Sequence, residues 1–192
     1  PRGLCDDFKR GIRMTHPDVY APAEDTWLLV RAAEKECRDG ERVLEIGCGS
    51  GAVSAALCPR ARVLATDINP HAVKAARVSG AEVVRTDLFS GICGIFDLVL
   101  FNPPYLPTTP EERMDDWLEY ALDGGPDGRA VIRRFLSGVG RVLAPGGRGL
   151  LLISSLTGLP EVCMLIRQAG FIPEVIIEEQ IEGEMLMVIR FS

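Results

Sequence analysis

The tetrapeptide Asn102-Pro103-Pro104-Tyr105 carries the clearest chemistry in this sequence. The two prolines lack an N–H and fix φ, so a backbone carbonyl stays free to accept a hydrogen bond beside the amide oxygen of Asn102. Tyr105 adds a flat ring that can lie against a flat group. Two acceptors and a ring together predict a site for a planar NH2 group, which is an amide or an exocyclic amine.

A simple turn is the alternative interpretation of this tetrapeptide, because Asn and Pro are ordinary turn residues. The apolar run 96–101 immediately before it is typical of a buried parallel strand. Pockets of open α/β sheets lie at the carboxyl ends of such strands. The lone pair of such a nitrogen is delocalised, so the nitrogen is a poor nucleophile unless both of its hydrogens are bound and the atom is aimed.

A glycine turn precedes this strand and predicts a nucleotide-like cofactor. Strand 43–46, with Glu45 near its tip, runs into Gly47-Cys48-Gly49-Ser50-Gly51 and then into an apolar helix. The glycines let the backbone approach a ligand at the amino end of that helix. A second strand, 62–67, ends at Asp67, where a carboxylate can accept both ribose hydroxyls. This pattern also fits a dinucleotide oxidoreductase, which would leave the tetrapeptide unexplained.

The remaining segments predict helices between most of the strands. We expect a helix that starts near Pro22, has two acids in its first turn and carries apolar residues at helical spacing from Trp27 to Cys37. This helix either covers the sheet or borders a pocket. Further helices are expected over 70–79, 128–143 and 159–170, and strands over 82–85, 149–153, 171–177 and 184–191, the last two as an antiparallel hairpin. Asp87 follows the strand 82–85, where its carboxylate either meets an adenine amino group or caps a short helix.

Composition limits the class of protein. The 192 residues are 47% hydrophobic, which suffices for one domain with a full core. A net charge of -6 disfavours a broad surface for nucleic acid. The six cysteines lack C-x-x-C spacing and are interpreted as reduced core residues. No apolar run approaches the roughly 20 residues that span a bilayer, and there is no leader, so a soluble intracellular protein is expected.

The motifs together resemble a known enzyme family. Glu45-x-Gly47-x-Gly49-x-Gly51, Asp67, Asp87-Leu88 and the tetrapeptide resemble the successive motifs of class I S-adenosylmethionine-dependent methyltransferases that act on an amide or amino nitrogen. Three further stretches resemble the eukaryotic and archaeal branch of the HemK-type glutamine methyltransferases: Asp18-Val19-Tyr20-x-Pro22-Ala23-Glu24-Asp25-Thr26, Gly124-Gly125-x-x-Gly128-Arg129 and Glu184-x-Leu186-x-Val188-x-Arg190-Phe191. Adenine-N6 methyltransferases of DNA or RNA share the tetrapeptide and are the alternative, and a non-catalytic scaffold is a further one.

The resemblance implies a fold, a domain organisation and a reaction. The fold is α/β and Rossmann-like, with a seven-stranded, mostly parallel sheet in the order 3-2-1-4-5-7-6 and an antiparallel last strand. Residues 1–192 form a single methyltransferase domain, in which residues 1–36 are an N-terminal cap segment. The reaction is methyl transfer from S-adenosylmethionine to the side-chain amide nitrogen of the glutamine in the Gly-Gly-Gln loop of the class 1 translation release factor.

The resemblance also implies roles for individual residues. Asn102, Pro103, Pro104 and Tyr105 would hold the substrate amide. Thr26, Glu45 and Gly47 would line the methionine end of the cofactor, Asp67 would hold the ribose, and Asp87 with the Leu88 backbone would hold the adenine. The full set of cofactor-binding residues is Tyr20, Thr26, Glu45, Gly47, Gly49, Gly51, Asp67, Ile68, Asp87, Leu88 and Asn102. No metal is expected.

The resemblance also implies partners for the protein. The resemblance implies a heterodimer with a small zinc-binding activator subunit, joined at the edge strand near Glu82 to Arg85, whose unpaired backbone groups can accept another strand. The release factor is the protein substrate, while neither a membrane nor stably bound nucleic acid is expected. The location is the cytoplasm, with nuclear presence also possible. The seven acids between residues 111 and 127 are either a solvated face or a surface that steers a basic release-factor tip.

Overall fold

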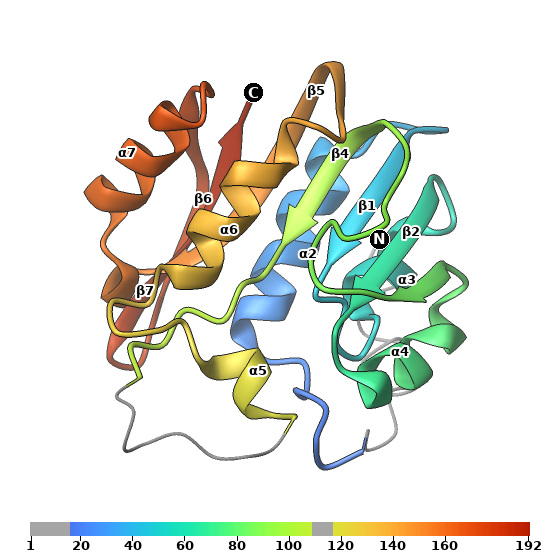
Figure 1. Ribbon diagram of the computed structural model, residues 1–192, viewed down its shortest axis with the longest axis horizontal. Helices are drawn as coiled ribbons and strands as arrows, with labels where there is room; N and C mark the ends of the chain where they lie inside the picture. The colour runs from blue at the N-terminus through green and yellow to red at the C-terminus, as the bar shows by residue number, and fades with distance from the viewer. Residues whose placement is uncertain (1–15, 109–116) are drawn as a thin grey trace.

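The computed structural model describes residues 16–108 and 117–192, and the strands in these residues form one sheet (Figure 1). The strand order is β3-β2-β1-β4-β5-β7-β6. β7 pairs antiparallel with β5 and β6, and the other neighbours are parallel. The predicted seven-stranded α/β fold, its strand order and its reversed last strand are therefore confirmed. The strands are β1 Arg42–Ile46, β2 Arg62–Asp67, β3 Glu82–Arg85, β4 Phe96–Phe101, β5 Leu143–Ser154, β6 Pro173–Ile181 and β7 Glu184–Phe191.

Helices connect most of these strands. They are α2 Glu24–Glu36, α3 Ala52–Leu57, α4 Pro70–Ala76, α5 Glu119–Leu122, α6 Ala130–Val139 and α7 Leu159–Gln168, with short 3-10 turns at Arg77–Ser79 and Ser155–Thr157. α4 begins where the sequence predicts, because the Asn69 side chain accepts a hydrogen bond from the His71 N–H at 2.8 Å. Among the described residues, no helix combines the length and the apolar character needed to cross a membrane.

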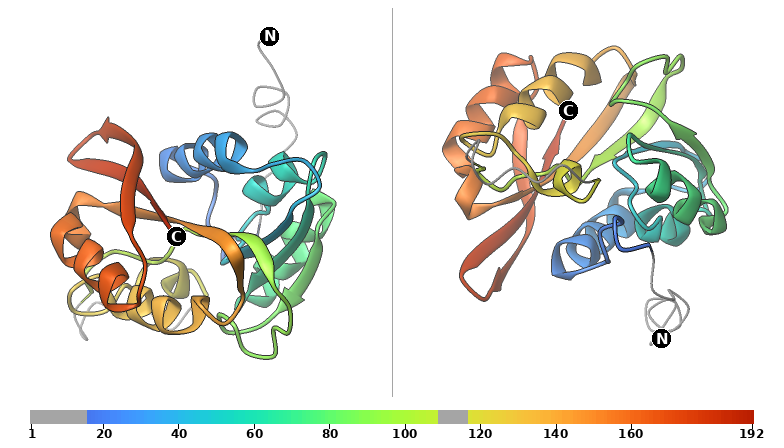
Figure 2. Two further views of the ribbon diagram at one scale, coloured as in Figure 1. Left: turned by 90° about the horizontal axis from the view of Figure 1, so that it is seen from above. Right: turned by 60° about the horizontal axis from the view of Figure 1, so that its bottom comes forward.

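The central strands, such as β1 and β4, are buried on both faces, and their successive side chains enter different cores. Leu98 and Leu100 of β4 pack in one hydrophobic cluster with α2 and α3, whereas Val99 and Phe101 pack in another with α6 and α7. Figure 2 shows α2 on one side of the sheet and α6 with α7 on the other. Helices cover both faces of the sheet, so a ligand-binding site is expected at the carboxyl ends of the parallel strands.

Two expected elements differ from the structure. The helix predicted over 128–143 is shorter, because the carbonyl of Val142 accepts the Phe96 N–H at 2.8 Å and Leu143 already pairs with β4. The strand predicted over 149–153 accordingly starts earlier, and the register with β4 shifts between Phe96 and Leu98. α5 lies in the acidic stretch, where no helix was expected.

Burial also corrects the interpretation of the cysteines. Cys37 and Cys48 are buried free thiols, but Cys93 is exposed. The predicted cap segment 1–36 is described only from residue 16, and its helix α2 contacts α3, β5, β6 and β7.

Candidate active site

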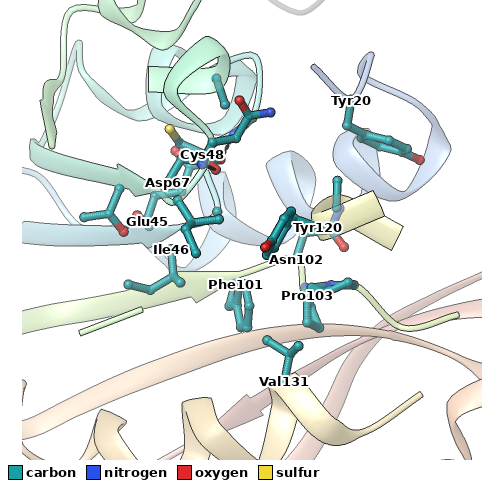
Figure 3. A pocket seen from close by; sticks show the side chains of 18 of the residues that line it. Tyr20, Glu45, Ile46, Cys48, Asp67, Phe101, Asn102, Pro103, Tyr120 and Val131 are labelled. Carbon is teal, nitrogen blue, oxygen red and sulfur yellow. Dashed lines mark hydrogen bonds between the residues drawn. The ribbon is translucent and has the colours of Figure 1, made fainter. Parts of the chain in front are cut away.

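A cavity of about 630 Å³ lies at the carboxyl ends of β1, β2 and β4. Its size falls in the range typical of sites for small molecules and cofactors. Almost all site residues predicted from the sequence line it: Tyr20, Thr26, Glu45, Gly47, Gly49, Asp67, Ile68, Asp87, Leu88, Asn102, Pro103, Pro104 and Tyr105. Figure 3 shows Glu45 and Asp67 on one side of the view, Asn102 and Pro103 near its centre, and Tyr20 on the other side. The structure thus gathers the separate motifs around one space.

The carboxylate of Asp67 is fixed by backbone N–H groups on two sides. The Gly49 N–H donates to Oδ2 at 2.9 Å and the Asn69 N–H donates to Oδ1 at 2.8 Å. Burial raises the pKa of Asp67, and these N–H groups oppose that rise. The glycine turn therefore aims an ordered carboxylate into the cavity, as an acceptor for a pair of hydroxyl groups requires.

Glu45 is an almost completely buried carboxyl group that also lines the cavity. Its Oε2 accepts a hydrogen bond from the Ser54 hydroxyl of α3. Burial raises the pKa of Glu45 to about 8, so the group is mostly protonated at neutral pH. A cationic ligand group beside Glu45 would favour the ionised form.

Asp87 and Leu88, which follow β3 in the chain, also line the cavity. Asp87 pairs with Arg134 of α6, whose Nη2 lies 2.6 Å from Oδ2. The side chain is thus part of an ion pair at the cavity wall. Leu88 is the one non-glycine residue of residues 16–108 and 117–192 with positive φ, at 47°. Such a backbone costs about 1–3 kcal/mol, and residues with it cluster at active sites and ligand-binding segments.

Asn102 is held by a residue far away in the sequence. Its Nδ2 donates to Oδ2 of Asp25 at 2.9 Å, and Asp25 is only 5% exposed. A carboxylate can only accept hydrogen bonds, so the nitrogen of the Asn102 amide must face Asp25. Oδ1 of Asn102 is consequently turned away, and it is buried without a hydrogen-bond partner among the described residues. An unpartnered buried acceptor at a cavity wall is suited to an N–H group of a ligand.

Asp25 is itself held in place by its neighbours in the chain. Its Oδ1 accepts the Thr26 N–H at 2.6 Å and the Thr26 hydroxyl at 3.2 Å. Burial, the charge of Asp25 and a hydrogen bond with Asp25 raise the pKa of Tyr20. Burial, followed by the charges of Asp25 and Glu184, raises the pKa of Tyr105. Both phenols therefore stay neutral beside a fixed negative charge.

The motif Gly124-Gly125-x-x-Gly128-Arg129 supports the backbone that follows Tyr105. The Gly124 N–H donates to the Leu106 carbonyl at 2.9 Å and the Thr108 N–H donates to the Gly125 carbonyl at 3.1 Å. A Cβ on Gly128, which has a φ of 69°, would lie only 2.4 Å from the carbonyl oxygen of Tyr105. This close approach explains why the position needs glycine.

One predicted residue lies elsewhere, and several cavity residues were not predicted. Gly51 does not line the cavity. It is the N-cap of α3 with a φ of 81°, and a Cβ there would lie 2.9 Å from Cα of Ala76. The unpredicted residues with functional groups include Asp25, Asn69, Trp117, Tyr120, Arg134 and Glu184. Asp25 and Glu184 stand within motifs that the sequence analysis singled out, so the signal for these two residues was present.

Comparisons with known proteins agree with this site. The model of the family "Methyltransferase small domain" matches residues 13–114. The protein MJ0928 of Methanocaldococcus jannaschii, which has a provisional N5-glutamine methyltransferase name, is 40% identical over 94% of this chain and 95% of its own length. Methyltransferase HEMK2 of Mus musculus is 39% identical over 91% of this chain and 90% of its own length.

A solved structure extends the similarity to a complex. It is the structure of the E. cuniculi Mtq2–Trm112 complex, which is responsible for the methylation of the translation termination factor eRF1. One chain of it superposes on this chain with a TM-score of 0.77 and 32% identity, covering 91% of this chain and 98% of the other.

The buried carboxyl group of Glu45 predicts how stability depends on pH. Its pKa is raised from 4.5 to about 8, so the folded state binds a proton that the unfolded state releases. The stabilisation is complete below pH about 4.5 and is lost as the pH rises through about 8. We expect the free energy of unfolding of the wild type to fall across this window. Glu45→Gln, which stays neutral, should lack that fall.

Chemical denaturation at a series of pH values measures both profiles. Glu34→Gln, which removes an exposed carboxylate from α2, is the matched control and should keep the wild-type slope. Equal slopes for the wild type and Glu45→Gln would contradict the raised pKa.

Proposed function

This chain belongs to the HemK-type protein N5-glutamine methyltransferases, and we propose that it methylates the glutamine of the Gly-Gly-Gln loop in a class 1 translation release factor. The enzyme transfers the methyl group of S-adenosylmethionine to the side-chain amide nitrogen. The observation that carries the proposal is the unpartnered, buried Oδ1 of Asn102, a residue that lines the cavity and whose Nδ2 is bound to Asp25.

The residues of the cavity fit the cofactor. Asp67 presents an ordered carboxylate for the ribose hydroxyls, and the strained Leu88 backbone with Asp87 borders the place for the adenine. Glu45 and Thr26 border the methionine end, where the ligand carries its positive charges. When bound, the cofactor supplies an electrophilic methyl group on a sulfonium.

The substrate amide then fits between two acceptors. We assign one N–H of the glutamine NH2 group to Oδ1 of Asn102 and the other to the carbonyl of Pro103, with the ring of Tyr105 against the amide plane. These contacts fix the direction of the nitrogen lone pair toward the cofactor side of the cavity. Positioning and exclusion of water can lower such a barrier by about 7–11 kcal/mol. The nitrogen gains the methyl group and loses one proton, and no residue is assigned as its base.

Two observations favour glutamine over the adenine-N6 alternative. The curated relatives with high coverage include a protein N5-glutamine methyltransferase, HEMK2 and an eRF1 methyltransferase catalytic subunit, and the related complex acts on a protein, eRF1. The net charge of -6 also opposes binding of a nucleic acid backbone.

A partner subunit belongs to the proposal as well. The related Mtq2 chain is in a complex with Trm112, and we propose a similar heterodimer here, through the edge strand β3. Its residues are largely exposed, including Val84 at 44%. An exposed edge strand can accept a strand from another chain, and such an edge in isolation promotes aggregation.

The proposal extends to location and organisation. We place the protein in the cytoplasm, where release factors act, with a nuclear pool also compatible, and we propose that residues 1–192 work as a single domain. The steering role suggested for the acids of 111–127 rests partly on Glu111, Glu112, Asp115 and Asp116, which lie outside the described residues. Asp127 pairs with Arg133 at 2.5 Å, so its charge is already compensated.

The contact between Asp25 and Asn102 predicts a selective loss of turnover. In Asp25→Asn the new amide can donate as well as accept, so the Asn102 side chain can turn over and present its nitrogen to the substrate. A hydrogen bond to a charged group contributes about 1.5–3 kcal/mol, so kcat should fall by roughly 10- to 100-fold. The dissociation constant for S-adenosylmethionine should change by less than about threefold. Both quantities are measured by methylation kinetics and calorimetry.

Glu24→Gln is the control for that variant, because Glu24 is an exposed acid in the same first turn of α2. It should keep wild-type turnover. If Asp25→Asn kept kcat within twofold, or lost activity only through weaker cofactor binding, the positioning role of Asp25 would be refuted.

Mass spectrometry of a purified release factor tests the reaction itself. After incubation with this chain, its zinc-binding partner and S-adenosylmethionine, the Gly-Gly-Gln peptide should gain one methyl group, and Asn102→Ala should remove this gain. The chain without its partner should be poorly soluble or inactive. Methylation of an oligonucleotide but not of the release factor would instead establish the adenine-N6 alternative.

A further inference from the structure

Both histidines of this chain meet beside one carboxylate, outside the active-site cavity. The rings of His16 and His71 stack with their centroids 3.8 Å apart and an angle of 11° between their planes. Oδ2 of Asp18 lies 3.6 Å from Nδ1 of His16 and 3.8 Å from Nε2 of His71. None of these three residues lines the cavity, and nothing in the proposed reaction uses them.

Backbone contacts of two separate segments bring the three side chains together. In the entry segment, residues 16–20, the Val19 N–H donates to the His16 carbonyl at 2.8 Å, so a tight turn places His16 next to Asp18. Asn69, which is only 5% exposed, donates from Nδ2 to the Asp18 carbonyl at 2.7 Å. The same side chain accepts the His71 N–H at 2.8 Å. One buried amide therefore joins the entry segment to the first turn of α4.

The functional groups of this cluster suit a divalent transition-metal ion. Imidazole nitrogens and carboxylate oxygens are common ligands of Zn²⁺. One such atom from each of His16, Asp18 and His71 lies within 4.8 Å of the others. Ligands of a tetrahedral Zn²⁺ lie about 3.3–3.6 Å apart, so a small side-chain rotation closes the distances to Asp18. The stacked rings must also tilt until both lone pairs point at one ion, and their partial exposure leaves room for this motion.

The carboxylate of Asp18 has no strong counter-charge. Among the described residues it pairs with the two imidazoles, which are charged only when protonated, and with no Lys or Arg. Nδ1 of His16 accepts the Asp18 N–H at 3.3 Å, so in this arrangement it carries no proton and keeps its lone pair. That contact is longer than an ordinary hydrogen bond. A bound metal ion would compensate the carboxylate and displace only this weak contact.

We propose that Nδ1 of His16, Oδ2 of Asp18 and Nε2 of His71 bind one Zn²⁺ ion, with water at the remaining coordination position. No metal is expected from the sequence, because the two histidines lie far apart in it and only the fold brings them together. The ion fastens the entry segment, whose Tyr20 lines the cavity, onto α4. This site is separate from the zinc of the proposed partner subunit and does not depend on the proposed reaction.

Nitrogen NMR of the chain with isotope-labelled histidine tests the site directly. The untagged chain, in complex with the unlabelled partner subunit, carries two labelled residues. One equivalent of Zn²⁺ should shift the signals of Nδ1 of His16 and Nε2 of His71, and both shifts should saturate together. If several equivalents of Zn²⁺ left these nitrogens unchanged, or shifted only one ring, the inference would be overturned.

Variants of the ligands show where the added Zn²⁺ binds. His71→Gln and Asp18→Asn should each weaken binding by more than about tenfold, as measured by competition with a coloured chelator. Asp39→Asn is the matched control, because Asp39 is an exposed acid in the turn between α2 and β1. Its affinity should stay within about twofold of the wild type. Equal affinities for the wild type and His71→Gln would place the ion elsewhere and overturn the inference.

Hydrogen exchange measures how the ion acts on the entry segment. At a Zn²⁺ concentration about ten times the dissociation constant, the Val19 N–H of the wild type should exchange about tenfold more slowly, because the ion opposes opening of the turn. His71→Gln should show no such protection. Unchanged exchange of the wild type at this concentration would contradict the proposed attachment to α4.

Discussion

The hydrogen bond from the Asn102 amide to the buried Asp25 carboxylate is the constraint on which this active site depends. Because a carboxylate has no proton to donate, it fixes which end of the Asn102 amide enters the cavity. The bond joins residues 77 positions apart, so the fold must bring them together. Asn102 directly follows β4 in the centre of the sheet, and Asp25 lies in the first turn of α2, which covers one face of the sheet. The two hydrophobic clusters on either side of the sheet fix the positions of β4 and α2.

At this edge of the sheet, one half of the strands borders the proposed cofactor position and the other half borders the proposed substrate position. The carboxyl ends of β1 and β2 carry Glu45 and Asp67, and the turn after β3 carries Asp87. All three residues border the proposed cofactor position. β4 and the start of the reversed β7 contribute Asn102 and Glu184, which border the proposed substrate position. Parallel strands that all end at one edge, with one antiparallel strand that begins there, place both halves of a two-substrate reaction within one cavity. Asp25 and Glu184 both line the substrate side of the cavity, so that side is suited to N–H donors.

Much of this arrangement could be predicted from the sequence, because its signals are local. Strands 62–67, 82–85, 96–101 and 184–191 have the bounds that their apolar runs and turn residues indicate. The predicted helix over 128–143 was too long, because Val142 and Leu143 continue the helical period but pair with β4 instead. The role of Asp25 was missed for a different reason: an acid in the first turn of a helix already has a local explanation. Only its burial against Asn102, which no local pattern contains, reveals the second role.

A neutron structure of the enzyme with its partner, S-adenosylhomocysteine and a Gly-Gly-Gln peptide would test the central claim most directly. Exchanged deuterium distinguishes the nitrogen of the Asn102 amide from its oxygen, which X-ray data at ordinary resolution do not. We expect deuterium density on the atom that faces Asp25, and a bare oxygen within hydrogen-bond distance of the glutamine NH2 group. Deuterium on the atom that faces the glutamine, or a substrate amide bound away from Asn102, would contradict this account.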